Sequence, residues 1–159
     1  MENEDFDFEL AYNELKGKHD LPEFKKLAED FDIEKVADKE SIFLVREIRR
    51  VINDKLSAYM HLFETLINPS APPMFIFSVL RGIKEEDKES IREIYKKLSK
   101  SQIEVMKLDT IYSEAGEVAF IKDVFADWQD LKKRIYKIIE NLDENIEKDD
   151  TSRSRGYFG

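Results

Sequence analysis

Apolar residues in the C-terminal half of the chain recur at alternating spacings of three and four. The series consists of Ile121, Val124, Trp128, Leu131, Ile135, Ile138 and Leu142. This spacing puts all the apolar side chains on one face of an α-helix, which then packs along neighbouring helices as in a coiled coil. We therefore expect a long helix at about residues 117–147.

A second apolar stripe predicts another long helix, at about residues 39–68. Its members are Val45, Ile48, Ile52, Leu56, Tyr59, Phe63 and Leu66. Asp38 is a suitable N-cap residue, and Pro69 ends the helix because the residue before a proline avoids helical backbone angles. Residues 85–115 carry a further helical pattern, in which the capping box at 101–104 predicts a restart after a kink.

The pattern leaves one helix boundary open, at residues 113–117. From Ile83 to Lys148 the chain has no proline and only one glycine, Gly116. One glycine costs a helix about 1 kcal/mol relative to alanine, which packing can offset. A turn at this point and an unbroken helix of some 45 residues, roughly 70 Å long, are equally compatible with the sequence. The unbroken rod would favour a second chain along its exposed half.

The N-terminal third predicts two short helices. One covers residues 5–16, with Phe6, Leu10 and Leu15 facing inward, and the other opens at Leu21. A proline at position 22 is compatible with a first helical turn.

A compact apolar helix follows Pro72 and Pro73 and ends near Gly82. Its apolar residues are Met74, Phe75, Ile76, Phe77, Val79 and Leu80. A helix that is apolar on nearly all sides is usually buried on several of them, so we expect a plug in the core. An exposed docking patch is the alternative.

Together these elements predict an all-α fold, an antiparallel helical bundle of five to seven helices with long C-terminal helices. The 159 residues favour one helical domain over residues 1–148. Within it, residues 1–37 form the short N-terminal helices and residues 38–148 the long-helix bundle. Residues 149–159 are charged and then rich in Ser, Arg and Gly, which predicts a flexible C-terminal tail.

The charge of the chain bears on its partners. The formal net charge is −9, which opposes binding to a phosphate backbone, so nucleic acid is an unlikely partner. Two basic clusters stand inside acidic helices, where we expect solvated faces with i,i+4 pairing. They are Arg46, Arg49 and Arg50 in one and Lys132, Lys133, Arg134 and Lys137 in the other.

The N-terminus is acidic where a signal peptide would be basic and then apolar, and no apolar stretch approaches the roughly 20 residues that span a bilayer. The chain also has no cysteine, which fits a reducing compartment. We therefore expect a cytoplasmic protein without membrane association.

Groups for nucleophilic or acid–base catalysis are sparse. His19 and His61 are the two histidines, too few for a three-histidine metal site. The chain has no glycine-rich phosphate loop and no Gly-x-Ser-x-Gly turn. The sequence therefore predicts no catalytic residue, no cofactor and, on balance, no enzyme.

One carboxylate pattern supports an alternative. Glu114 and Glu117, followed by Glu140 and Asp143, have the form E-x-x-E…E-x-x-D. This pattern, with the local string EAGEVA, resembles the signature of the all-helical MazG-type nucleoside triphosphate pyrophosphohydrolases. The resemblance implies that these four residues are metal ligands that hold Mg²⁺ for the hydrolysis of a nucleotide. A Mg²⁺-dependent hydrolase of this type must bring the four carboxylates into one cluster.

The C-terminal segment is the other candidate site. Arg153 and Arg155 are followed by the aromatic pair Tyr157 and Phe158. Arginine and aromatic residues are typical interface anchors, and a flexible segment can dock in a groove of another protein. The sequence favours the alternative, an unstructured end without a role. The sequence as a whole favours a non-enzymatic module for protein–protein interaction or assembly, acting on a protein partner or as a homodimer.

Overall fold

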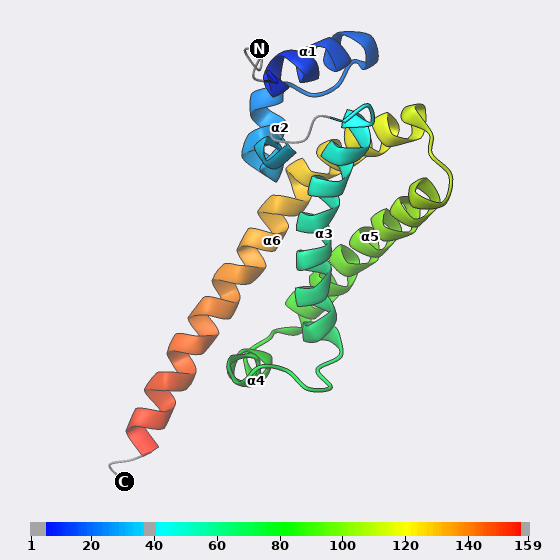
Figure 1. Cartoon of the computed structure of the whole chain (residues 1–159). Helices are drawn as coiled ribbons and strands as arrows, with labels where there is room; N and C mark the ends of the chain where they lie inside the picture. Colours follow the sequence, from blue (N-terminus) through cyan, green and yellow to red (C-terminus); the bar gives the residue numbers. More distant parts are fainter. Residues whose placement is uncertain (1–5, 37–40, 157–159) are drawn as a thin grey trace. The chain divides into compact units, whose positions relative to one another are not determined.

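The computed structural model describes residues 6–36 and 41–156, and its side chains are described as far as residue 148 (Figure 1). The elements, in chain order, are α1 (Phe8–His19), α2 (Phe24–Phe31), the 3-10 helix η1 (Ile33–Val36), α3 (Leu44–Ile67), α4 (Met74–Arg81), α5 (Glu85–Thr110) and α6 (Glu114–Gly156). Residues 6–36 and 41–156 contain no strand. The predicted all-α helical bundle is confirmed over these residues.

The chain divides into two compact units. Unit 1 consists of Met1–Ala58 and Lys100–Trp128, and unit 2 of Tyr59–Ser99 and Gln129–Gly159. The helices α3, α5 and α6 each contribute one stretch to each unit. In the described residues, no helix is both long and apolar enough to cross a membrane. The predicted domain over 1–148 and the flexibility of residues 149–159 stay predictions, although the backbone of α6 is helical through Gly156.

The first helix differs from its prediction in position and in buried face. The side chain of Asp7 accepts a hydrogen bond from the backbone N–H of Leu10, so α1 begins at Phe8 rather than at residue 5. It ends at His19, before the C-cap Asp20 with its left-handed backbone (φ 54°), and not at Gly17. As a result Phe8 and Tyr12 are buried, and Leu10 is exposed.

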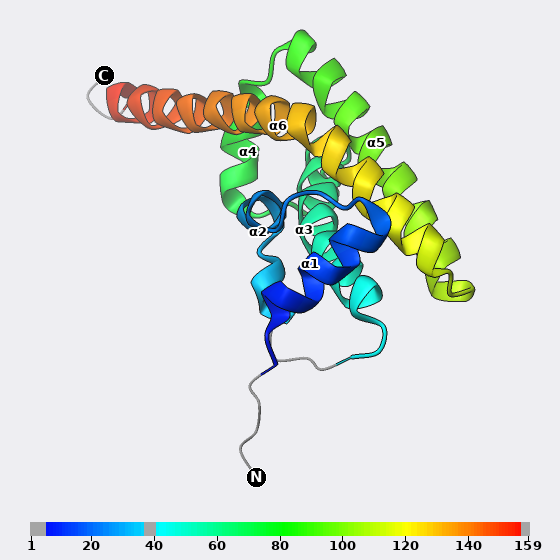
Figure 2. The ribbon, with the colours of Figure 1, turned by 90° about the horizontal axis from the view of Figure 1, so that it is seen from above.

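The core of unit 1 forms where the short helices meet α3 and α6. Figures 1 and 2 show α2 beside the N-terminal half of α6, and the rings of Phe31 and Trp128 lie 5.3 Å apart there. The side-chain amide of Gln102 on α5 donates to Asn53 and Ser57 on α3. Arg49, earlier on α3, contacts Asp109, which is later on α5, so α3 and α5 are antiparallel in unit 1.

The turn between α5 and α6 settles the boundary that the sequence left open. The helix α5 ends at Thr110, and the hydroxyl of Ser113 accepts a hydrogen bond from the N–H of Gly116 in the first turn of α6. A Cβ on Gly116 would lie 2.8 Å from a methyl group of Leu108. The serine therefore starts a new helix, and the glycine lets the end of α5 approach it closely.

In unit 2 the helices α5 and α6 are also antiparallel. The guanidinium of Arg134 donates to Glu93 at 2.6 Å, and the amide of Asn141 donates to Asp87 at 3.2 Å. The same stretch of α6 passes close to the end of α4, since a Cβ on Gly82 would lie within 2.7 Å of the Asn145 amide. The predicted restart of the helix at residues 101–104 is not seen, because α5 continues through them as one helix.

The predicted apolar faces of both long helices are confirmed. Six of the seven stripe residues of α6 are buried: Ile121, Val124, Trp128, Leu131, Ile135 and Ile138. The seventh, Leu142, is half-buried. On α3, all the stripe residues are buried except the half-buried Tyr59.

The buried face of α6 in unit 2 generates a stability prediction. Ile135 is 2% exposed, so Ile135→Asp places a charge without a partner in the core and removes apolar contacts. We expect a loss of at least about 3 kcal/mol in the free energy of unfolding. Its neighbour Tyr136 is 64% exposed, and Tyr136→Asp is the matched control, for which we expect little change. Chemical denaturation measures both, and equal stabilities would contradict the assigned face.

Candidate functional site

The structure does not bring the four predicted metal ligands together. Glu114 and Glu117 lie in the first turn of α6, whereas Glu140 and Asp143 are exposed residues much further along the same continuous helix. Among the residues that the structure describes, no three His, Asp or Glu side chains form a group that could hold a metal ion. The single cluster that the MazG-type resemblance requires is therefore not seen.

Glu117 instead forms a buried ion pair with Arg49, which lies on α3. The Arg49 Nε donates to the Glu117 Oε2 at 2.7 Å, and its Nη2 donates to Asp109 at 2.6 Å. Both Arg49 and Glu117 are essentially inaccessible to solvent. Burial alone would lower the pKa of Arg49, but the hydrogen bonds and charges of Glu117 and Asp109 outweigh it and raise that pKa.

Arg46 completes this charged cluster on its half-exposed side. Its Nε donates to the Glu117 Oε1 at 3.3 Å, and its Nη2 donates to the Leu108 carbonyl. The guanidinium carbon also lies 4.5 Å from the centroid of the Tyr112 ring. The expectation that the basic residues near position 46 form a solvated face is wrong for Arg49, since its partners come from α5 and α6.

Glu114 is held by α1 at the edge of the same cluster. Its Oε1 accepts hydrogen bonds from the Lys18 ammonium at 3.0 Å and lies 2.7 Å from the His19 Nε2. The hydrogen bond from Lys18, followed by that from His19, lowers the pKa of the Glu114 carboxyl. Both acidic residues of the first E-x-x-E pair are thus engaged by cations of the protein, and the cluster ties α1, α3 and α5 to the start of α6.

The C-terminal candidates are only partly described. Arg153 and Arg155 lie in the last turns of α6, and their side chains are outside the description. Tyr157 and Phe158 lie outside the described residues. Partner binding by these four residues stays a prediction.

The helix α4 exposes half of its six apolar residues. Ile76 and Val79 are buried, but Met74 is 84% exposed, Phe75 57% and Phe77 50%. The expected plug is therefore wrong, and the docking patch is the alternative that agrees with the exposure. In an eight-residue helix, a 100° step per residue puts positions 76 and 79 on one side and position 74 opposite them. We call Met74, Phe75 and Phe77 the α4 surface.

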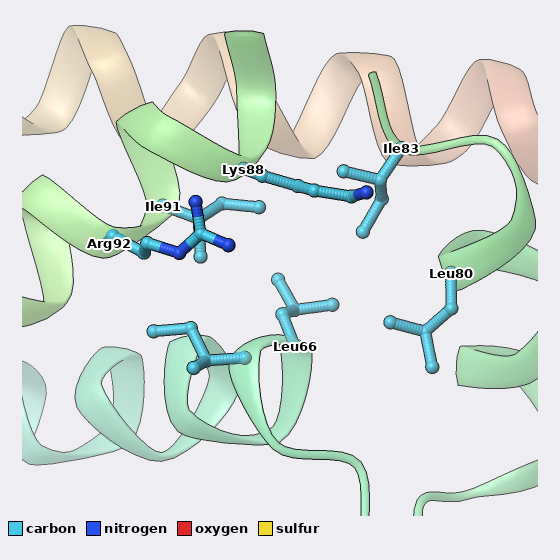
Figure 3. A pocket seen from close by; sticks show the side chains of 7 residues that line it. Leu66, Leu80, Ile83, Lys88, Ile91 and Arg92 are labelled. Carbon is cyan, nitrogen blue, oxygen red and sulfur yellow. The ribbon is translucent and has the colours of Figure 1, made fainter. Parts of the chain in front are cut away.

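A pocket of about 210 Å³ adjoins the α4 surface. Its lining residues are Leu66, Ile67, Leu80, Ile83, Lys88, Ile91 and Arg92. Figure 3 shows aliphatic side chains from α3, α4 and α5 around the pocket, with the long side chains of Lys88 and Arg92 extending over it from α5. Phe77 and Leu80 are neighbours on α4 at i,i+3, so the pocket continues one flank of the α4 surface.

Sequence reasoning identified the apolar residues of α4 but missed the pocket. The i,i+4 spacing of Lys88 and Arg92 was the one visible signal, and it puts both cations on one face of a helix. The aliphatic residues that they cover come from three separate elements. No local sequence pattern could therefore have predicted that these residues line one pocket.

Comparisons with models of known protein families, with curated proteins and with solved structures give no match for this chain.

The buried ion pair generates a prediction for unit 1. Glu117→Gln leaves the buried Arg49 with only part of its charge compensated, and breaking such a pair costs about 3–5 kcal/mol. We expect that loss in the free energy of unfolding, measured by chemical denaturation.

The double variant Arg49→Met/Glu117→Leu provides the control, because it removes both charges and fills the space with apolar atoms. It should recover more than half of the loss, as replacement of a buried pair by apolar residues is often near neutral. A double variant no more stable than Glu117→Gln would contradict a role through pairing.

Proposed function

We propose that this protein is a non-enzymatic module for protein–protein interaction or assembly, and that the α4 surface is its contact surface. The observation that carries the proposal is the exposure of Met74, Phe75 and Phe77 on one short helix. Contiguous exposed patches of large apolar residues mark interaction sites in soluble proteins.

The residue types of the α4 surface support this proposal. Methionine and phenylalanine are enriched in the cores of protein interfaces. Methionine adapts to irregular partner surfaces because its side chain is unbranched and flexible. Burial of an exposed Phe or Met side chain contributes about 1.5–3 kcal/mol, so three of them can support a specific contact.

The proposal includes self-association as a homodimer and a cytoplasmic location. A homodimer would bury apolar surface without a second gene product. A chain without cysteine needs no disulfide and is compatible with a reducing compartment. No residue is assigned a catalytic role, because the carboxylates of the first turn of α6 are engaged by Lys18, His19, Arg46 and Arg49.

Site-specific photocrosslinking tests the contact surface. A photoreactive phenylalanine analogue at position 75 should give covalent adducts in concentrated pure protein or in cells that express it. The same analogue at Lys96, an exposed residue of α5, is the control and should give none.

In the position-75 protein, Met74→Ser/Phe77→Ser should reduce the adducts at least about tenfold, because the apolar contact is lost. Circular dichroism should stay unchanged and thermal melting should change little, since Met74 is 84% exposed and Phe77 50%. Equal adducts from positions 75 and 96, or none from position 75, would contradict the proposal.

A further inference from the structure

The pocket beside α4 fits an occupant with one large apolar group. Leu66, Leu80, Ile83 and Ile91 give it aliphatic walls (Figure 3). An apolar cavity of about 150 Å³ accommodates a benzene ring, so a pocket of about 210 Å³ has room for one phenylalanine side chain. Small-molecule sites are usually larger, about 300–1,000 Å³.

The two cations of the pocket fit a carboxylate beside that apolar group. Lys88 and Arg92 contact Glu85 and Glu89 at 3.1 and 3.7 Å, each within one turn of α5. Such exposed pairs contribute only about 0–1 kcal/mol. An ammonium has three N–H donors and a guanidinium five, so both cations keep donors for an incoming carboxylate.

Glu85 and Glu89 also restrict where a carboxylate can lie. A negative group near them is repelled, whereas one held directly over Lys88 or Arg92 is attracted. The pocket therefore fits a side chain of the size of phenylalanine with a carboxylate next to it that lies over Lys88 or Arg92.

The chain contains such a segment at its N-terminal end. The sequence Asp5-Phe6-Asp7 places a phenylalanine between two aspartates. Phe6 precedes α1 and is 39% exposed, whereas Phe8 is buried in unit 1. Asp7 caps α1 through Oδ1 and has a second carboxylate oxygen to offer.

The aromatic pair near the other end of the chain has the wrong charge for this pocket. Tyr157 and Phe158 follow Arg153 and Arg155, which would be repelled by Lys88 and Arg92. Charge complementarity therefore selects the N-terminal segment.

We propose that Phe6 of one copy of the chain enters this pocket in a second copy, with Asp5 and Asp7 against Lys88 and Arg92. The inference rests on the proposed function and names a second copy as the partner. When the docking is reciprocal, each copy supplies one segment and one pocket, and the pair is closed.

Sedimentation velocity of the full chain at roughly 1–100 µM tests the docking. We expect a concentration-dependent dimer that Phe6→Ser weakens at least about tenfold. Leu10→Ser is the matched control, because Leu10 is a 59% exposed apolar residue of the neighbouring helix and has no part in the proposed contact. Its dimer should match that of the unmodified chain.

A charge exchange then tests the pairing. Asp5→Lys/Asp7→Asn retains a cap for α1 and should weaken the dimer; Lys88→Glu/Arg92→Glu should do the same. The chain with all four substitutions should recover part of the dimerisation, since the lysine introduced at position 5 faces the carboxylates introduced at positions 88 and 92.

A monomer at every concentration, a dimer unaffected by Phe6→Ser, or no recovery in the fourfold variant overturns the docking. If adducts from position 75 persist in any of these cases, the α4 surface still contacts a partner, and only the proposal that Phe6 occupies the pocket is contradicted. Loss of the adducts as well removes both proposals.

Discussion

Burial of one apolar face of α6 supports the helices of both units. In unit 1 this face presents Ile121, Val124 and Trp128 to the core, and in unit 2 it presents Leu131, Ile135 and Ile138. A helix derives most of its stability in a protein from such packing rather than from intrinsic propensity. The alternation of three and four keeps the face continuous, so α6 supplies both cores from one element.

The ion pair between Arg49 and Glu117 constrains unit 1 in a different way. Removal of two charges from water is costly, and their attraction compensates only when the geometry is good and further donors and acceptors are satisfied. Here Asp109 and Arg46 supply those further partners. Because the four side chains come from α3, α5 and α6, the pair is formed only when the turn at residues 111–113 brings these helices together. The ion pair therefore favours the one conformation of this turn that places Glu117 and Asp109 beside Arg49.

The α4 surface and its pocket follow from the shortness of α4. Two turns between Pro73 and Gly82 offer one side to the core, which takes Ile76 and Val79. The other apolar side chains remain at the surface, and the flank that carries Leu80 contributes to the pocket. Pro73 and Gly82 bound the helix, so the apolar segment cannot extend into a longer element with its own packed face. The same residues that make α4 apolar all round therefore leave large apolar side chains exposed.

Residues of α3 and α6 show how much the sequence by itself determined. Their spacing predicted the long helices and the buried faces, because periodicity along a helix is a local property that reports directly on which side meets the core. The prediction for α1 was less accurate. Asp7 caps this helix, so the helix begins at Phe8 rather than at residue 5, and Phe8 is buried instead of Phe6. At residues 113–117 the spacing allowed a turn or a rod, and the Ser113 cap with the close approach of Leu108 decided for the turn.

Only the tertiary structure decided which sides of a helix are covered by its neighbours and which charged side chains form ion pairs. The composition of α4 identified an apolar helix but not which sides a neighbour covers, and Arg49 resembled a surface residue until α5 and α6 supplied its partners. The carboxylates that matched a metal motif in the sequence lie on one helix, where Glu117 faces arginines. Each of these outcomes depends on contacts between residues that are distant in the chain. A local sequence pattern carries information only about residues that are close in the chain.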